Sequence, residues 1–380
     1  MGQSQTLSRL AGWVYGAPEG LPALQDAEEL APGVLRLLGQ NPGPATLQGT
    51  NTYLLGTGPE RILVDTSDGN GSWWPLLRRA LADRGARVGC VLLTHRHYDH
   101  TGGVAAVRTA FPEATVWKGP DELETPPPQA PPPAGATAEA AGGDVPPPPV
   151  PAADQAREIG GADRRHRRRW LSEAHQQGRG RCWCDGGVPT DCKVLTEGQA
   201  FAVGDATLRV LLTPGHSSDS ACFLLEPAGN TPSSTAAILT GDTVLGGVAG
   251  RFDDLRAYMA SLRLLLELAQ ERPTALFPGH GAAVAADSAA SYLAGMLQTL
   301  TRRERAVRDV LRGAGGDCSV DEVCSSIYGD GMAASMAHEM VQQHVDVLVA
   351  KGLARENPGW LFSNRYETLE APLEERGDDW

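Results

Sequence analysis

The stretch LLTHRHYDHTGG, residues 92–103, is the most informative part of this sequence, because an apolar run ends there in histidines and an aspartate. The chain of 380 residues has nine histidines, and three of them lie here within six positions. The preceding residues VGCVLL form the continuous apolar run of a strand buried on both faces. We therefore expect His95, His97, Asp99 and His100 to follow a buried strand.

Three further strand-like runs end in the same residue types. ATLRVLLTPGH ends at His216, AAILTGD at Asp242 and TALFPGH at His280. Segments with helical spacing alternate with such strands along the chain, which indicates an α/β core in layers. In α/β folds the carboxyl ends of the strands form a common rim where ligands bind. The sequence thus predicts that these residues gather at one edge of the molecule with the four from 92–103.

Imidazole and carboxylate side chains in this number favour a centre of two metal ions. A single tetrahedral zinc uses four ligands, and these residue types suit Zn²⁺, Mn²⁺ or Fe²⁺. Two such ions, ~3.5–4 Å apart, can share a hydroxide that acts as the nucleophile in hydrolysis. We expect two divalent ions, with Zn²⁺ preferred, and a catalytic role for Asp99, Asp242 and His280.

The motifs THRHYDH, TPGH, LTGD and FPGHG, with ILVDT upstream, resemble the metal-binding motifs of the metallo-β-lactamase superfamily. The resemblance covers roughly residues 33–118 and 193–285 and implies an αββα sandwich. It implies one metal held by His95, His97 and His216, and a second held by Asp99, His100 and His280. It also implies that Asp242 bridges both metals and that Asp65 orients the ligand loop.

A narrower resemblance concerns function. NPGPATLQGTNTYLLGTG, together with the helical segments after His280, is similar to the branch called β-lactamase-like protein 2, whose members carry a C-terminal winged helix and cleave single-stranded RNA. It implies an endoribonuclease acting on single-stranded RNA. Thioesterases associated with polyketide synthesis resemble the same branch, so hydrolysis of acyl or polyketide thioesters is the alternative. The fold by itself does not choose between them.

The chain divides by composition. Eleven prolines lie between Pro126 and Pro151 with few large apolar side chains, and such a segment buries too little surface to offset its ordering entropy. The basic run RRHRRR, 164–169, follows and has two interpretations, a contact with RNA phosphates or a solvated run of charge. The predicted parts are an N-terminal extension (1–32), a metallo-β-lactamase domain (33–285) with a disordered insertion (about 120–192), a winged-helix-like domain (286–365) and an acidic tail (366–380).

Composition and charge limit the kinds of partner that this protein can be expected to have. No apolar run is long enough to span a bilayer, so no membrane partner is expected. The first thirty residues lack the pattern of a secretory signal, and seven irregularly spaced cysteines fit a reducing compartment. We expect an intracellular soluble protein of the mitochondrial matrix or the cytoplasm. A net charge of −13, and a single lysine in MAHEMVQQHVDVLVAKG, argue against sequence-specific DNA binding. That helix is better suited to orienting the substrate or to forming a homodimer.

Overall fold

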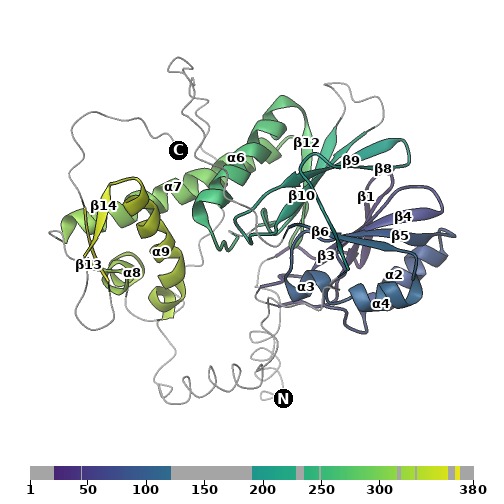
Figure 1. Cartoon of the computed structure of the whole chain (residues 1–380), viewed down its shortest axis with the longest axis horizontal. Helices are drawn as coiled ribbons and strands as arrows, with labels where there is room; N and C mark the ends of the chain where they lie inside the picture. The colour runs from purple at the N-terminus through teal and green to yellow at the C-terminus, as the bar shows by residue number, and fades with distance from the viewer. Residues whose placement is uncertain are drawn as a thin grey trace, which may run out of the picture.

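The computed structural model describes residues 21–43, 45–120, 191–227, 235–247, 250–314, 318–329, 332–357 and 364–368 (Figure 1). The predictions for the proline-rich insertion and for the basic run fall outside this described part, apart from residues 120, 191 and 192 at the ends of the insertion. The final residues of the predicted acidic tail also fall outside it.

The first sheet has seven strands in sequence order, from β1 to β7. Its first four strands are antiparallel neighbours, and β4 to β7 are parallel. The apolar run before the histidines forms β5, which pairs on both sides. Its strands are β1 (Ala27–Ala31), β2 (Val34–Leu38), β3 (Asn51–Leu55), β4 (Glu60–Val64), β5 (Arg87–Leu92), β6 (Thr115–Lys118) and β7 (Lys193–Val194).

The second sheet has five strands in the order β12-β11-β10-β9-β8. Its strands β8 to β11 are antiparallel neighbours, and β12 joins β11 in parallel after a helical crossover. The parallel pair places the carboxyl ends of β11 and β12 together, as the predicted rim requires. The strands are β8 (Ala200–Val203), β9 (Ala206–Leu212), β10 (Ala221–Glu226), β11 (Ala236–Gly241) and β12 (Thr274–Pro278).

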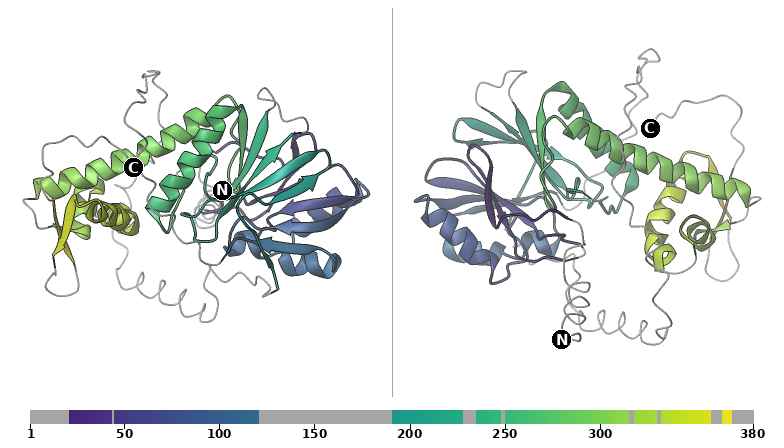
Figure 2. Two further views of the ribbon diagram at one scale, coloured as in Figure 1. Left: turned by 45° about the horizontal axis from the view of Figure 1, so that its top comes forward. Right: turned by 180° about the vertical axis from the view of Figure 1, so that it is seen from behind.

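Helices cover the outer face of each sheet, and the two sheets pack on each other. Tyr53 of the first sheet stacks on Phe277 of the second, with ring centroids 6.0 Å apart. Trp73 and Leu77 of α2 pack on the first sheet, and Leu262 of α6 packs on the second. The predicted αββα sandwich is therefore confirmed (Figure 2). The covering helices are α2 (Trp73–Ala82), α3 (Tyr98–Thr101), α4 (Val104–Ala110), α6 (Leu255–Glu271) and α7 (Ala289–Gly313).

A smaller C-terminal domain follows the sandwich. It consists of α8 (Val320–Tyr328), α9 (Met332–Ala350) and a three-stranded sheet, β13-β15-β14. A reciprocal capping box between Ser319 and Glu322 begins α8, because each side chain bonds the other's backbone amide. The order of helices followed by a hairpin is the one expected from the sequence, and the specific likeness to a winged helix stays a prediction. The strands are β13 (Cys318–Ser319), β14 (Ala354–Asn357) and β15 (Arg365–Thr368).

Helix α7 belongs to both parts of the molecule. Leu293 and Leu300 in its first half pack against the sandwich, and Val307 and Leu311 in its second half pack in the C-terminal domain. Figure 2 shows it as one long helix that reaches from the sandwich to that domain. The predicted boundary after residue 285 is thus followed by a rigid connection.

Two predicted boundaries need correction. Residues 27–31, assigned to the N-terminal extension, form β1 at the edge of the first sheet. This half-exposed edge strand has the sequence AEELA, which carries little of the apolar alternation by which strands are recognised. Residues 366–368, assigned to the acidic tail, belong to β15, where the buried ring of Tyr366 anchors the strand in the C-terminal core. Within the described residues, no helix has the length and apolar character needed to cross a membrane.

Candidate metal centre

All seven predicted ligands lie together where four strands end. His95 and His97 follow β5, and Asp99 and His100 stand on the short helix α3. The other three, His216, Asp242 and His280, lie just beyond β9, β11 and β12. The rim therefore draws on both sheets, with residues up to 185 positions apart in the sequence. Three groups of these side chains have ligand atoms within 4.8 Å of one another.

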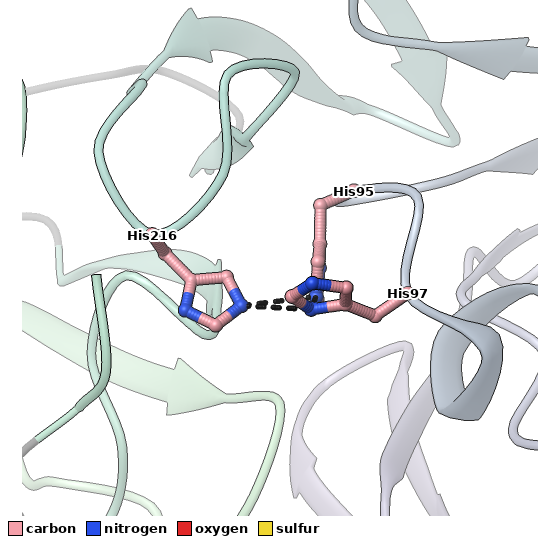
Figure 3. Close-up of side chains that lie close together, drawn as sticks. All are labelled: His95, His97 and His216. Atoms are coloured by element: carbon pink, nitrogen blue, oxygen red, sulfur yellow. Dashed lines mark hydrogen bonds between the residues drawn. The ribbon is translucent and has the colours of Figure 1, made fainter. Parts of the chain in front are cut away.

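The first cluster is formed by three histidines whose rings face a common point (Figure 3). Nδ1 of His97 lies 2.8 Å from Nε2 of His95 and 3.0 Å from Nε2 of His216. The two Nε2 atoms are 3.2 Å apart. Nitrogen ligands of a tetrahedral zinc, each ~2.0–2.1 Å from the metal, lie roughly 3.3 Å from one another. The three nitrogens are thus spaced as a metal ion requires, with a slight contraction.

Hydrogen bonds behind the rings determine which nitrogens face inward. His95 donates from Nδ1 to Oγ1 of Thr94 at 3.0 Å, and the Thr94 hydroxyl donates to Oδ2 of Asp65 at 2.8 Å. His216 donates from Nδ1 to the carbonyl oxygen of Arg251 at 2.8 Å. Because each Nδ1 carries the proton, the lone pair of each Nε2 is left to face the centre.

The second cluster combines Asp99, His100 and His280. Nε2 of His280 lies 3.1 Å from Nε2 of His100 and 3.1 Å from Oδ2 of Asp99. His100 donates from Nδ1 to Oδ2 of Asp65 at 2.7 Å, so its Nε2 also faces the centre. Asp99, with a side chain 21% exposed, is the most exposed member of this cluster. It is therefore the member of this cluster most open to solvent.

Asp242 lies between the two clusters. Its Oδ1 is 3.3 Å from Nε2 of His100 and 3.4 Å from Nε2 of His280, and its Oδ2 is 3.7 Å from Nε2 of His216. Gly279 allows this close approach, since a Cβ at that position would lie 2.5 Å from Oδ1 of Asp242. The carboxylate thus presents one oxygen to each cluster, which is the arrangement expected of a bridging ligand.

Asp65 orients both clusters from behind. It is buried and accepts a hydrogen bond from the backbone amide of Thr94 at 2.8 Å, in addition to those from His100 and the Thr94 hydroxyl. Its backbone is in the left-handed region, with φ of 60°. A strained residue of this kind persists where the surrounding structure requires it, which is common at functional sites. This contact with His100 agrees with the orienting role implied for Asp65.

The charges around the two clusters differ. The pKa of His97 is lowered to about 4. Burial is the main cause, and the neighbouring His216 and His100 add to it, while Asp242 acts in the opposite direction. Burial also lowers the pKa of His280, but the carboxylates of Asp242 and Asp99 outweigh burial and raise it to about 9. The same balance raises the pKa of His100 well above its usual range. The surroundings therefore favour the protonated form of His100 and His280 and the neutral form of His97.

These residues fit a pair of divalent cations. Oδ1 of Asp242 is buried and accepts no hydrogen bond that meets normal geometry within the described structure. The inward nitrogens of His95 and His216 have no proton to share, because Nδ1 carries it. Lone pairs that face one another are repulsive unless a cation or proton lies between them. Cations at the two clusters would remove this repulsion and replace the protons of the second cluster.

Several contributors to the site were not singled out from the sequence. Arg96 lies between two predicted ligands and pairs with Asp219 and Asp253, each at 3.1 Å, which ties the histidine loop to the neighbouring loops. Its position inside THRHYDH was a signal that could have been used. The carbonyl oxygen of Arg251, which holds His216, has no signal in the sequence, because every residue has a carbonyl group.

Fold and site together define a class of protein, an αββα sandwich whose rim carries histidine and aspartate clusters suited to binding metal ions. A family model described as the metallo-beta-lactamase superfamily matches residues 45–280, and the chain belongs to this superfamily.

Relatives with curated names are similar over most of the chain. The "Atrochrysone carboxyl ACP thioesterase" of Aspergillus fumigatus is 32% identical to this chain. The similarity extends over 82% of this chain and 74% of that protein. The "Lactamase-like protein ptaB" of Pestalotiopsis fici is 30% identical, over 89% of this chain and 86% of that protein. Among solved structures, a beta-lactamase domain protein from Burkholderia ambifaria has a TM-score of 0.64 at 20% identity, and covers 94% of this chain and 97% of that chain. At this identity the structural likeness supports the fold alone.

Proposed function

We propose that this protein is a metal-dependent thioesterase that hydrolyses an acyl or polyketide thioester carried by an acyl carrier protein. The observation that carries the proposal is the similarity to several relatives named as atrochrysone carboxyl ACP thioesterases, which extends over more than four-fifths of the chain. The sequence favoured an endoribonuclease, and these names favour the alternative instead. Cleavage of single-stranded RNA therefore becomes an outcome of the test.

The proposal includes a centre for two zinc ions. His95, His97 and His216 would hold one, Asp99, His100 and His280 would hold the other, and Asp242 would contribute to both. Bound divalent ions would polarise the thioester carbonyl and lower the pKa of water. The protein supplies orientation, because Asp65, Thr94 and the Arg251 carbonyl keep three imidazole rings turned inward.

The reaction adds the oxygen of water to the carbonyl carbon and breaks the carbon–sulfur bond. The products are a carboxylic acid and the thiol of the carrier. A thiol has a pKa of about 8.5, so it leaves readily as a thiolate and needs no proton donor in the site. We assign to Asp99 the position nearest the substrate, because its carboxylate is the most solvent-exposed member of its cluster.

The test compares two substrates on one preparation of protein. An acyl thioester of pantetheine, followed by release of free thiol, is measured beside end-labelled single-stranded RNA, with and without chelator. The proposal expects thiol release that the chelator abolishes, and intact RNA. Asp99→Ala should abolish thiol release, while Asp287→Ala should not, because Asp287 is an exposed loop residue whose carboxylate accepts a hydrogen bond from Ser288 and is not one of the predicted ligands. Cleaved RNA with an intact thioester would overturn the proposal in favour of the endoribonuclease.

A further inference from the structure

One segment of the sandwich, residues 251–255, contacts both the metal centre and the C-terminal domain. Its first residue, Arg251, accepts the Nδ1–H of His216 at its carbonyl oxygen. Two of its backbone amides, those of Asp253 and Asp254, donate to the carbonyl oxygen of Gly215 at 2.7 and 3.0 Å. The segment therefore holds both the ring of His216 and the backbone residue before it.

Helix α9 of the C-terminal domain holds the same segment from the other side. The side-chain amide of Gln343 donates to the carbonyl oxygen of Phe252 at 3.0 Å and accepts from the backbone amide of Leu255 at 2.9 Å. The Phe252 carbonyl lies outside the described strands and helices, and Leu255 begins α6, where the first backbone amides of a helix have no partner within the helix. Gln343 thus satisfies one donor and one acceptor that would otherwise lie half-buried without a protein partner.

Packing supports this connection. Phe252 is buried in the core of the sandwich, and its ring lies edge-on to His344 of α9 with centroids 6.4 Å apart. Val347 of α9 is buried in the same core cluster. An exposed ion pair between Arg251 and Glu339 lies beside these contacts, and such a pair contributes little by itself. The hydrogen bonds of Gln343 are therefore the specific polar link between the two parts.

We propose that Gln343 is a positioning residue of the metal centre, and that the C-terminal domain orients His216 through the turn at 251–255. The Phe252 carbonyl belongs to the peptide unit that follows the one carrying the Arg251 carbonyl. The two planar units meet at the Cα of Phe252, whose side chain is buried, so a bond at the second carbonyl limits how far the first can rotate. That carbonyl in turn fixes the ring of His216 and leaves Nε2 toward the first cluster. This inference rests on the metal centre of the proposed function and not on its substrate.

The test compares Gln343→Leu with Gln342→Leu. Gln342 is the neighbouring half-buried residue on α9, and its side chain bonds Asp346 and Tyr366 within the C-terminal domain. Zinc affinity is measured by competition with a chromophoric chelator. The imidazole Nδ1–H of His216 is followed by NMR in the metal-free protein.

Groups that orient metal ligands change metal affinity by about 10–100-fold, and Gln343 acts through one further peptide unit. We expect Gln343→Leu to weaken zinc binding about 10-fold at the site that contains His216. We also expect faster exchange of the His216 Nδ1 proton with solvent.

Gln342→Leu should leave both readouts at their wild-type values. If Gln343→Leu does not fold, Gln343→Glu decides, since it keeps an acceptor for Leu255 and removes the donor to Phe252. A folded Gln343 variant with wild-type zinc affinity and an unchanged His216 signal would overturn the proposal. Neither readout uses a thioester, so a failure of the thioesterase assignment would be seen separately, as absent thiol release by the wild-type protein.

Discussion

At the scale of single residues, two carboxylates have different roles in the candidate metal centre. Asp65 orients ligands from behind, whereas Asp242 faces both clusters directly. Asp65 accepts a hydrogen bond from His100, whereas Asp242 presents its oxygens to the space where metal would lie. Replacing each carboxylate by its amide keeps the size of the side chain and removes the charge, so the two roles can be separated.

Asp65→Asn should weaken metal binding without disturbing the backbone. Asparagine tolerates the left-handed conformation that this position requires, at φ of 60°. An asparagine has one acceptor oxygen where the carboxylate has two, so it cannot accept from both the Thr94 amide and His100, and the ring is held less firmly. We expect a loss of about 10–100-fold in zinc affinity, measured by chelator competition. Wild-type affinity in this variant would show that His100 needs no charged partner.

Asp242→Asn should impair both metal sites at once. One carboxylate serves the two clusters, so a neutral side chain with one oxygen removes charge from each. The zinc content of the purified protein, measured by elemental analysis, should fall from about two ions per chain to less than one. Asp287→Asn is the control, because that aspartate is exposed and is not one of the predicted ligands. Loss of a single ion with full retention of the other would contradict a bridging role.

At the scale of elements, α9 carries a buried histidine that the metal centre does not use. His344 is 1% exposed, and neither ring nitrogen has a hydrogen-bond partner within the described structure. Burial, and then the positive charges of Arg303 and Lys351, lower its pKa to about 4. The ring packs against Phe252, so this neutral histidine lies in the contact between α9 and the sandwich.

His344 should make the protein sensitive to acid. The unfolded chain binds a proton near pH 6.5 and the folded chain only near pH 4, so the free energy of unfolding decreases as the pH falls through this window. The full effect is about 3 kcal/mol. His344→Leu should abolish this part of the pH dependence in denaturant titrations at pH 7 and pH 4. His338→Leu, at an exposed position on the same helix, should keep the wild-type dependence.

At the scale of the whole molecule, the sandwich is complete on both sides of the long insertion. Strands β6 and β7 pair directly, with Trp117 opposite Lys193, and Asp191 forms a two-pronged ion pair with Arg108. The seven predicted ligands all lie outside residues 121–190. The chain on either side therefore has its own contacts that hold the two ends of the insertion in place.

Replacement of residues 121–190 by a short Gly/Ser linker should leave zinc content and basal turnover nearly unchanged. Loop length has a small effect on closure entropy, about 0.6 kcal/mol for each doubling. The shift in unfolding temperature on adding zinc is compared between the two proteins. A ligand that binds the folded state stabilises it, so equal shifts indicate equal zinc binding. A folded deletion protein that takes up no zinc would show that the insertion contributes ligands.

Local patterns carried much of the prediction. Apolar runs that end in histidine or aspartate are local features, and they pointed to all seven candidate ligands and to a layered α/β core. The αββα order of the layers came from the family resemblance. The edge strand β1 was missed, because a half-exposed strand shows little alternation, and the extent of β15 was missed, because a single buried tyrosine anchors it. The substrate was also out of reach, since the same ligands can serve hydrolysis of either a phosphodiester or a thioester.

The sequence by itself determined which side chains can bind metal, because residue type and strand position are both written along the chain. The tertiary structure alone decided how each ring is turned. The Arg251 carbonyl that holds His216, and the Gln343 amide that holds the next peptide unit, act through backbone groups common to every residue. Their partners are 35 and 91 residues away, so only folding brings them into contact and makes them specific.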